Sequence, residues 1–136
     1  MTYTTTWRVF LDMQREKVFI NFSHHPSVNW SKEQITEAQK YGEIIDIPFP
    51  DVDPNLDSDQ ISHIACEYTN KILDYNPSAV MCQGEMTLCF KVVKLLKSQG
   101  IPVLAACSAR EVSFDTLEDG SLVKTQKYRF VRFRNY

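Results

Sequence analysis

Ala79-Val-Met-Cys-Gln-Gly-Glu-Met-Thr-Leu88 and Ile101-Pro-Val-Leu-Ala-Ala-Cys-Ser-Ala-Arg110 are the two halves of the stretch that decides the fold. Each half contains a short apolar run, and a mostly apolar segment that closes at Gly100 joins them. Two buried strands with a helix between them form a βαβ unit, in which the strands are parallel. Polar residues follow both apolar runs, and ligands of open α/β sheets bind at the carboxyl ends of strands. The stretch therefore predicts both a parallel sheet and a ligand site.

The chain before this stretch repeats the same alternation. Lys17–Ser23 and Glu43–Phe49 have the composition of buried strands. Between them, Ser31-Lys-Glu-Gln34 has the spacing of a capping box, and the helix that it opens ends at Gly42. Asp57 or Ser58 caps a further helix, whose apolar residues recur with helical spacing at Ile61, Ile64, Ala65, Tyr68, Ile72 and Leu73.

The pattern after Arg110 contains strands only. Glu111–Leu117, a turn at 118–120 and Ser121–Arg134 predict a β-hairpin that follows a fourth parallel strand. Tyr128 and Phe130 lie on even positions, whereas Val131 and Phe133 lie on odd ones. The last strand is therefore either buried on both faces or bulged near Phe130.

The predicted fold class is α/β, with a Rossmann-like, mostly parallel sheet flanked by helices and a C-terminal β-hairpin. We expect residues 1–136 to form a single domain, with residues 1–16 as an N-terminal extension. A net charge of −2 argues against the coating of long nucleic acids, which favours strongly basic proteins. Charge is nevertheless segregated, with six acids and no base in 43–59 and five bases and no acid in 121–136.

The four cysteines show no metal-binding spacing, so we interpret them as small apolar residues of a reduced, cytoplasmic protein. No apolar run has the length of a transmembrane helix, and we expect no signal peptide and no membrane contact. The helix over 86–98 is apolar nearly all round and must be covered on more than one side. This predicts a homodimer, with the N-terminal extension as the alternative cover.

Polar residues near the four predicted strand ends form a candidate site. They are Asn21, Ser23, His24, His25, Gln83, Gly84, Glu85, Thr87, Ser108 and Arg110. Gly84 would allow a ligand to approach the backbone, and the following helix would offer its N-terminus to an anion. Hydroxyl groups and an arginine fork suit phosphate oxygens. The set therefore indicates a phosphate-bearing small ligand.

Structural explanations compete with this interpretation. Asn21 and Ser23 could simply end a strand, the two histidines could be surface residues, and Glu85 could be a favourable charge in a first helical turn. Trp30 and Phe49 could stack on a base or belong to the core. Asp51 and Asp53 resemble an acidic metal pair, but they also suit a turn before Pro54. The G-x-G-x-x-G, P-loop and G-x-S-x-G motifs are absent.

Four segments in order resemble small CRISPR-associated proteins of the Csx group. They are Asn21-Phe-Ser-His-His-Pro26, Gln83-Gly-Glu85, Ala105-Ala-Cys-Ser-Ala-Arg110 and the closing Tyr128-Arg-Phe-Val-Arg-Phe-Arg-Asn-Tyr136. The resemblance covers 17–136 and implies a CARF-like fold and a homodimer. It also implies a ring nuclease that binds and cleaves cyclic oligoadenylate, first of all cyclic tetra-adenylate, and so ends type III CRISPR signalling.

The implied chemistry needs no metal and no cofactor, because a ribose 2′-hydroxyl attacks the adjacent phosphorus and leaves a 2′,3′-cyclic phosphate. We expect His24, with His25 as substitute, to transfer the proton. Ser23 and Ser108 would orient the phosphate, Arg110 would stabilise its charge, and Asn21, His25, Gln83, Gly84, Glu85 and Thr87 would line the site. The alternatives are a sensor or sponge that does not cleave, and a Mg²⁺-dependent phosphate hydrolase that uses Asp51, Asp53 or Glu85.

Overall fold

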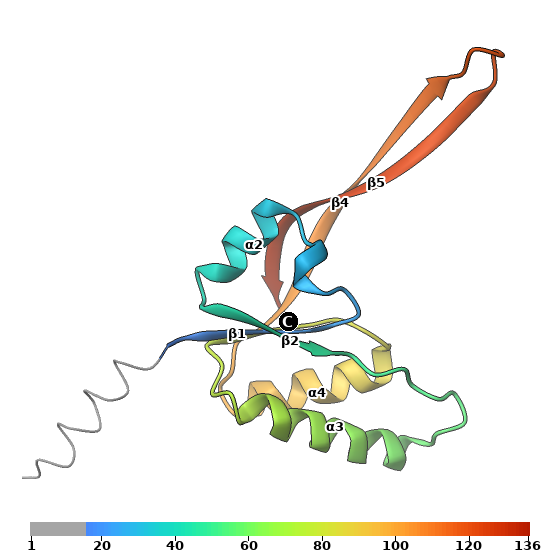
Figure 1. Ribbon diagram of the computed structural model, residues 1–136. Coiled ribbons are helices and arrows are strands. Elements are labelled where there is room, and N and C mark those ends of the chain that lie inside the picture. Colours follow the sequence, from blue (N-terminus) through green and yellow to red (C-terminus); the bar gives the residue numbers. More distant parts are fainter. Residues whose placement is uncertain (1–15) are drawn as a thin grey trace, which may run out of the picture.

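The protein is built on one five-stranded sheet, seen edge-on in Figure 1. The computed structural model describes residues 16–136, so the predicted N-terminal extension lies outside the described residues except for Glu16. The strand order is β2-β1-β3-β4-β5, and only β5 is antiparallel to its neighbour. The strands are β1 (Val18–Ser23), β2 (Glu43–Pro48), β3 (Ala79–Cys82), β4 (Val103–Thr116) and β5 (Leu122–Asn135). The predicted α/β class with a C-terminal antiparallel strand pair is confirmed.

Helices cover both faces of the sheet (Figure 1). The short helix η1 (Ser27–Asn29) and α2 (Lys32–Gln39) lie on one face, where Phe19, Met81 and Leu104 form a small core with Ala38. On the other face, α3 (Ser58–Leu73) and α4 (Met86–Ser98) pack over a larger core. The apolar stripe predicted for α3 is confirmed, because all six of its members belong to that core or pack against it.

The helix starts follow from their capping residues. Asp57 caps α3 and forms a complete capping box with Gln60, in which each side chain bonds the backbone N–H of the other. Ser31 caps α2 by accepting from the backbone N–H of Gln34 at 3.2 Å. The predicted reciprocal bond is missing there, because the Gln34 amide contacts the Met81 sulfur at 3.7 Å instead.

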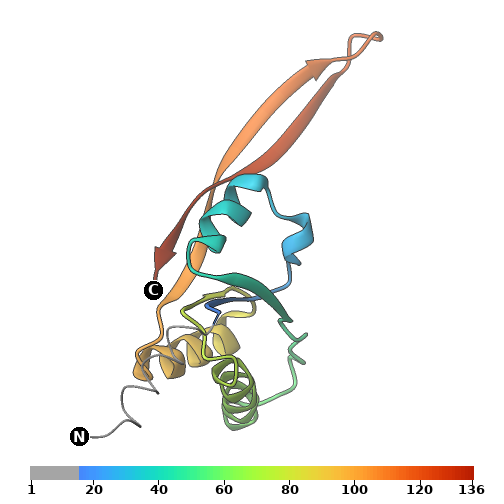
Figure 2. The ribbon, with the colours of Figure 1, turned by 60° about the vertical axis from the view of Figure 1, so that its left-hand side comes forward.

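The fourth parallel strand and the first strand of the hairpin are one continuous strand, β4, and the prediction of two separate strands was wrong. β4 pairs with β3 only at Val103 and Leu104. It then leaves the body of the protein and pairs with β5 as far as Thr116, so that the hairpin projects as an arm (Figures 1 and 2). Ser108 and Arg110 therefore lie within a strand and not at a strand end.

Of the two alternatives for the last strand, the structure shows the bulge and not burial on both faces. The pairing register shifts between Cys107 and Ser108, whose partners are Arg132 and Phe130, so Val131 is the extra residue. The extra residue turns Phe130 and Phe133 toward each other, with ring centroids 5.0 Å apart. This explains the change from even to odd aromatic positions. Within residues 16–136, no helix is long and apolar enough to cross a membrane.

Candidate functional site

A pocket of about 540 Å³ lies at the carboxyl edge of the parallel strands, on the α2 face of the sheet. We call it the edge pocket. It is lined by His25, Asn29, Trp30, Ser31, Gln34, Met81, Gln83, Ala106, Ser108, Tyr128 and Phe130. In the sheet, β2 lies on one side of β1 and β3 lies on the other side. The strand order therefore reverses at β1. A ligand crevice is expected at such a reversal of strand order.

Asn21 and Ser23 hold the loop after β1 in place. The Asn21 amide donates to the carbonyl oxygen of His25 at 2.9 Å and to Oδ1 of Asp46 at 3.0 Å. The Ser23 hydroxyl donates to the Asn21 side chain at 2.7 Å and accepts from the His25 N–H at 3.1 Å. Both side chains are buried and committed to these bonds. They position the loop, whereas direct contact with a ligand was predicted.

Asp46, which was not among the predicted site residues, completes this network from β2. Its second carboxylate oxygen accepts from the backbone N–H and the hydroxyl of Ser27, at 3.0 and 3.1 Å. Asp46 therefore joins the end of β1 to the start of η1. Asp46 stands out as a polar residue between Ile45 and Ile47 in β2, but the sequence does not reveal a partner so distant along the chain.

The two histidines after β1 point in different directions. The His25 carbonyl accepts from the Trp30 indole N–H at 3.0 Å, and His25 lines the edge pocket. His24 instead packs beside Phe49, with ring centroids 5.3 Å apart, and is not among the residues that line the edge pocket. His25 is consequently the histidine available to a ligand in this pocket, although His24 was preferred from the sequence.

Where β3 and β4 separate, the side chain of Gln83 takes the place of the backbone hydrogen bonds between the two strands. Its side-chain oxygen accepts from the Ala106 N–H at 3.0 Å, and its side-chain nitrogen donates to the Ala106 carbonyl at 3.4 Å. These bonds continue the ladder by two residues beyond Leu104, the last β4 partner of β3. Gln83 therefore bridges the two strands where they separate, and its side chain lines the edge pocket.

Gly84 allows the close approach of an aromatic ring. A Cβ atom at this position would lie 2.5 Å from two atoms of the Phe49 ring, which is far inside van der Waals contact. Phe49 itself is 4% exposed and stacks near Phe22 in the core. The glycine is therefore explained by packing, and the predicted approach of a ligand to the backbone is not needed to account for it.

Glu85 occupies the N-terminus of α4, where an anion was predicted to bind. Its carboxylate accepts from the N–H groups of Thr87 and Leu88, at 3.1 and 2.9 Å, and from the Thr87 hydroxyl at 2.7 Å. The pKa of Glu85 lies below its ordinary value because of the Leu88 N–H, then the Thr87 hydroxyl and the Thr87 N–H. A second anion would meet a negative charge here, so this helix end is a weak candidate for phosphate binding in the observed conformation.

Ser108 and Arg110 lie on one face of β4, because residues two apart along a strand share a face. Ser108 lines the edge pocket and pairs with Phe130, and Arg110 pairs with Tyr128, which also lines the pocket. Arg110 is exposed and lies next to the pocket wall, just beyond the lining itself. Of the ten predicted site residues, the pocket thus brings together His25, Gln83 and Ser108, with Arg110 beside them.

Most of the aromatic wall was not predicted from the sequence. Trp30, for which the sequence left stacking and core packing open, is a half-buried lining residue. Tyr128 is 70% exposed at the rim, and Phe130 lies at the back of the pocket. An exposed tyrosine opposite an arginine is a signal for a binding surface, but only the hairpin register reveals that pairing.

The pocket offers aromatic surfaces, hydroxyl and amide groups and one imidazole. Among residues 16–136, no three His, Cys, Asp or Glu side chains gather as a metal site. Asp53 accepts from the N–H and the side-chain amide of Asn55, at 2.9 and 3.1 Å, as expected for an acidic turn. The turn explanation therefore accounts for this aspartate.

Residues 16–134 match the family described as Uncharacterized protein MJ1673 family. No curated protein and no solved structure matches the chain.

Proposed function

The chain belongs to the MJ1673 family, and we propose that it is a ring nuclease that binds cyclic oligoadenylate in the edge pocket and cleaves it without a metal ion. The observation that carries the proposal is the combination of Trp30, Tyr128, His25 and Ser108 around one pocket at the carboxyl edge of the sheet. Aromatic faces stack on bases regardless of sequence, and hydroxyl and imidazole groups suit a phosphodiester. The order β2-β1-β3-β4-β5 is the flavodoxin-like order of doubly wound α/β sheets, which also bind ligands at this edge, and a CARF-like identity is part of the proposal.

The volume of about 540 Å³ lies within the usual range for small-ligand pockets. One adenylate unit is small enough to enter such a pocket, whereas a ring of four extends beyond it. Two copies of the pocket around a two-fold axis would meet a two-fold symmetric ring. The proposal therefore includes a homodimer.

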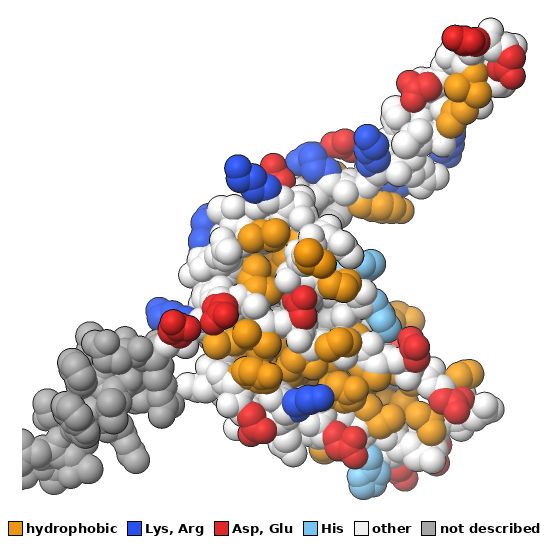
Figure 3. All heavy atoms as spheres, in the orientation of Figure 1, with side chains coloured by type: hydrophobic (Ala, Val, Ile, Leu, Met, Phe, Trp, Pro, Cys, Tyr) orange, Lys and Arg blue, Asp and Glu red, His pale blue; other side chains and the backbone are white. Residues whose placement is uncertain are grey.

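The arm supports this dimer. Val112, Phe114, Leu122 and Tyr128 fall on one face of the hairpin by its register, and all four are exposed. A two-stranded hairpin is marginally stable in water unless its apolar face is covered. The same face carries Ser108 and Phe130 at its base, so a second copy packed on the arm would border the edge pocket. Lysine and arginine side chains lie along the lower part of the arm with acidic side chains between them (Figure 3), and Arg129 is paired there with Glu111.

The proposed reaction uses the ligand's own ribose. The 2′-oxygen attacks phosphorus, the bond from phosphorus to the 5′-oxygen breaks, and the proton from the 2′-hydroxyl ends on that leaving oxygen. His25 would carry the proton, Ser108 would orient the phosphate, and Arg110 would stabilise the charge that develops. Asn21 and Ser23 would act indirectly, by fixing the backbone of the loop that carries His25.

Incubation with cyclic tetra-adenylate in EDTA, followed by separation of the products, tests the activity. The proposal predicts linear products that end in a 2′,3′-cyclic phosphate. A ring that stays bound and unchanged would support the second candidate, a sensor or sponge that does not cleave. The Ser23 hydroxyl favours this candidate, because it is already hydrogen-bonded to Asn21 and does not orient a phosphate. Cleavage that EDTA abolishes would support a metal-dependent hydrolase instead.

Arg110→Ala is expected to reduce turnover by about 100-fold, the usual effect of removing one group that stabilises a developing charge. Ser108→Ala should also reduce turnover, and both variants should retain the wild-type melting temperature because the two side chains are exposed. Lys71→Ala, on the opposite helical layer, is the matched loss of one positive charge and should leave turnover unchanged. Normal cleavage by both pocket variants would show that the reaction occurs elsewhere.

A further inference from the structure

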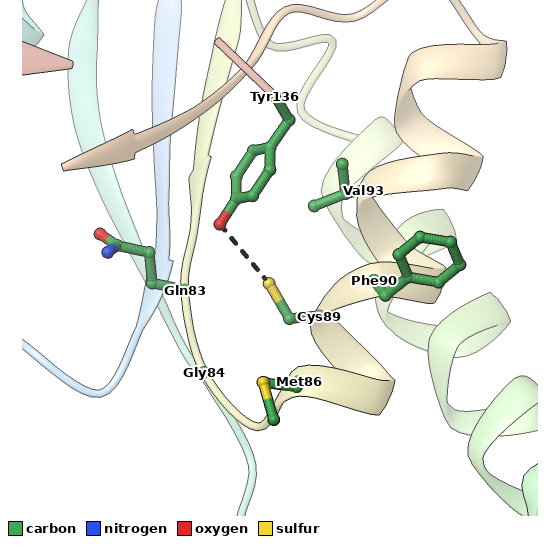
Figure 4. A pocket seen from close by; sticks show the side chains of 7 residues that line it. All are labelled: Gln83, Gly84, Met86, Cys89, Phe90, Val93 and Tyr136. Atoms are coloured by element: carbon green, nitrogen blue, oxygen red, sulfur yellow. Dashed lines mark hydrogen bonds between the residues drawn. The ribbon is translucent and has the colours of Figure 1, made fainter. Parts of the chain in front are cut away.

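A second pocket lies on the other side of Gln83, between α4 and the end of β5 (Figure 4). Its volume is about 380 Å³, and it is lined by Gln83, Gly84, Met86, Cys89, Phe90, Val93 and Tyr136. We call it the Tyr136 pocket. In Figure 4 the Tyr136 hydroxyl points toward the Cys89 sulfur, at 3.8 Å. Nothing in the proposed function uses this pocket.

Two free thiols meet at the inner end of the Tyr136 pocket. Cys82 is the last residue of β3, and Cys89 lies in the first turn of α4. Their sulfur atoms are 3.6 Å apart, and the glycine turn between them brings strand and helix back on each other. A disulfide bond needs about 2.05 Å, so the two sulfurs would have to approach by about 1.5 Å.

The two thiols differ in their access to solvent. Cys82 is fully buried, whereas Cys89 is 8% exposed and lines the pocket. A small oxidant that enters the pocket would therefore reach Cys89 first. Tyr136 holds the end of β5 against β3 and α4 beside the two thiols. Its hydroxyl donates to the Cys82 carbonyl at 2.7 Å, and its backbone oxygen accepts from the Lys97 ammonium at 2.7 Å.

We propose that Cys89 and Cys82 form a peroxide-reactive thiol pair, in which Cys89 is the attacking thiol and Cys82 the resolving one. The Cys89 thiolate attacks hydrogen peroxide, an S–O bond forms as the O–O bond breaks, and hydroxide leaves. Sulfur loses two electrons to the peroxide and becomes a sulfenic acid. The Cys82 sulfur then attacks the Cys89 sulfur, and the displaced hydroxide leaves as water with the Cys82 proton. A small thiol such as glutathione reverses the bond by exchange.

The charged and titratable groups around Cys89 favour this division of roles. The Cys82 thiol as donor is the first cause that lowers the pKa of Cys89 to about 7, and the Gly84 N–H adds to it, while burial and the Glu85 carboxylate oppose them. The Tyr136 proton is already donated to the Cys82 carbonyl. The pKa of Cys82 is raised by its bond to Cys89 and by burial, so Cys82 stays protonated. Burial beside Cys89, Cys82 and Cys107 likewise raises the pKa of Tyr136, which keeps its hydroxyl proton. Since the thiolate is the nucleophile, Cys89 should react more readily at neutral pH than an ordinary cysteine.

The test treats the reduced full chain with one equivalent of hydrogen peroxide at pH 7 and maps the cysteines by mass spectrometry. No Lys or Arg lies between Lys71 and Lys91, so trypsin leaves both cysteines in one peptide. We expect this peptide to lose the mass of two hydrogen atoms. Cleavage after Glu85 should then leave the two halves joined until a reductant is added. Cys66, which is exposed on α3, is the internal control and should be oxidised several-fold more slowly.

Cys82→Ala separates the two roles. In this variant the oxidation should stop at a sulfenic acid on Cys89, which dimedone would trap, and no intramolecular bond should form. Cys89→Ala should leave Cys82 unmodified under the same treatment. If Cys82→Ala does not fold, the wild-type peptide map alone decides. Oxidation of Cys66 before Cys89, or a Cys82–Cys89 peptide that keeps both thiols, would overturn the proposal.

Discussion

At the residue scale, Glu85 shows how one side chain serves the fold at the expense of an anion site. The carboxylate satisfies two of the N–H groups that a helix N-terminus leaves without partners. Because these groups are taken, the proposed phosphate-bearing ligand would have to find its donors in the edge pocket and on Arg110. This is why the proposed binding site lies on the α2 face, although the turn of Gln83, Gly84 and Glu85 was expected to contribute as a whole.

Glu85→Ala is expected to lower the free energy of unfolding by about 1 kcal/mol, the usual effect of losing a helix cap. Denaturant unfolding at pH 7 measures this loss, and Glu67→Ala, an exposed position within α3, is the control. An unchanged midpoint for Glu85→Ala would contradict the capping role.

The same residue predicts a pH dependence. The folded pKa of Glu85 lies below its ordinary value of 4.5, so the unfolded chain binds the proton more tightly. The stabilisation is therefore complete above the unfolded pKa and is lost as the pH falls through the folded one. Between pH 6 and pH 3, the wild type should lose more stability than Glu85→Gln. Parallel curves for the two proteins would exclude this contribution.

At the element scale, Gln83 and β4 determine the shape of the site. β4 has two backbone pairs with β3, and the Gln83 side chain extends this contact before the strand leaves the sheet. Without that side chain, the Ala106 N–H would have no partner on β3. The edge pocket would then lose the wall that separates it from the Tyr136 pocket, since Gln83 lines both.

Gln83→Leu keeps the size of the side chain and removes both bonds to Ala106. We expect the amide hydrogen of Ala106 to exchange with solvent at least about tenfold faster, which corresponds to the roughly 1.4 kcal/mol that a hydrogen bond of this kind contributes. Hydrogen exchange followed by NMR measures this rate, with the amide of Val80 in the centre of the sheet as the internal control. Equal exchange at Ala106 in both proteins would show that Gln83 does not hold β4.

The elements of the body could be predicted because their patterns are local. Periodic apolar residues and caps place α3, and α4 begins and ends where the sequence indicates, at Met86 and Ser98. β4 could not be predicted as one strand, because a polar residue after a buried run usually marks a strand end. In an arm that leaves the body, both faces meet solvent, so Ser108 and Arg110 continue the strand.

The site was predictable only in part, for a related reason. The location at the carboxyl edge follows from topology, and His25, Gln83 and Ser108 do line the edge pocket. The different placement of His24 and His25 depends on hydrogen bonds that the Asn21 and Trp30 side chains donate to the His25 carbonyl. Such contacts have no signature in sequence, and neither does the pairing that brings Tyr128 opposite Arg110.

At the scale of the whole molecule, the arm carries the exposed apolar face on which the proposed dimer rests. Its apolar face and the exposed side chains of Met86 and Phe90 on α4 are left open to solvent in one copy. The apolar character of α4 predicted a homodimer, but α3 already covers one side of that helix. We therefore place the proposed interface on the arm.

We expect the wild type to elute in size-exclusion chromatography with light scattering at twice the chain mass. Phe114→Ser with Leu122→Ser removes the apolar face of the arm tip and should give a monomer. Val123→Ser, on the opposite face of the same hairpin, is the matched control and should remain dimeric. A monomeric wild type at high concentration would contradict the dimer, and a dimeric double variant would exclude the arm as its interface.

The central claim is that the edge pocket binds cyclic oligoadenylate, and calorimetric titration with cyclic tetra-adenylate tests it most directly. Tyr128 is exposed at the pocket rim, and removing one stacking ring typically costs about 1–3 kcal/mol. Tyr128→Ala should therefore bind roughly 5- to 150-fold more weakly than the wild type. Tyr75→Ala, an exposed tyrosine after α3 on the opposite face, should bind as the wild type does. Equal affinity of all three proteins, or no binding by the wild type, would contradict the account.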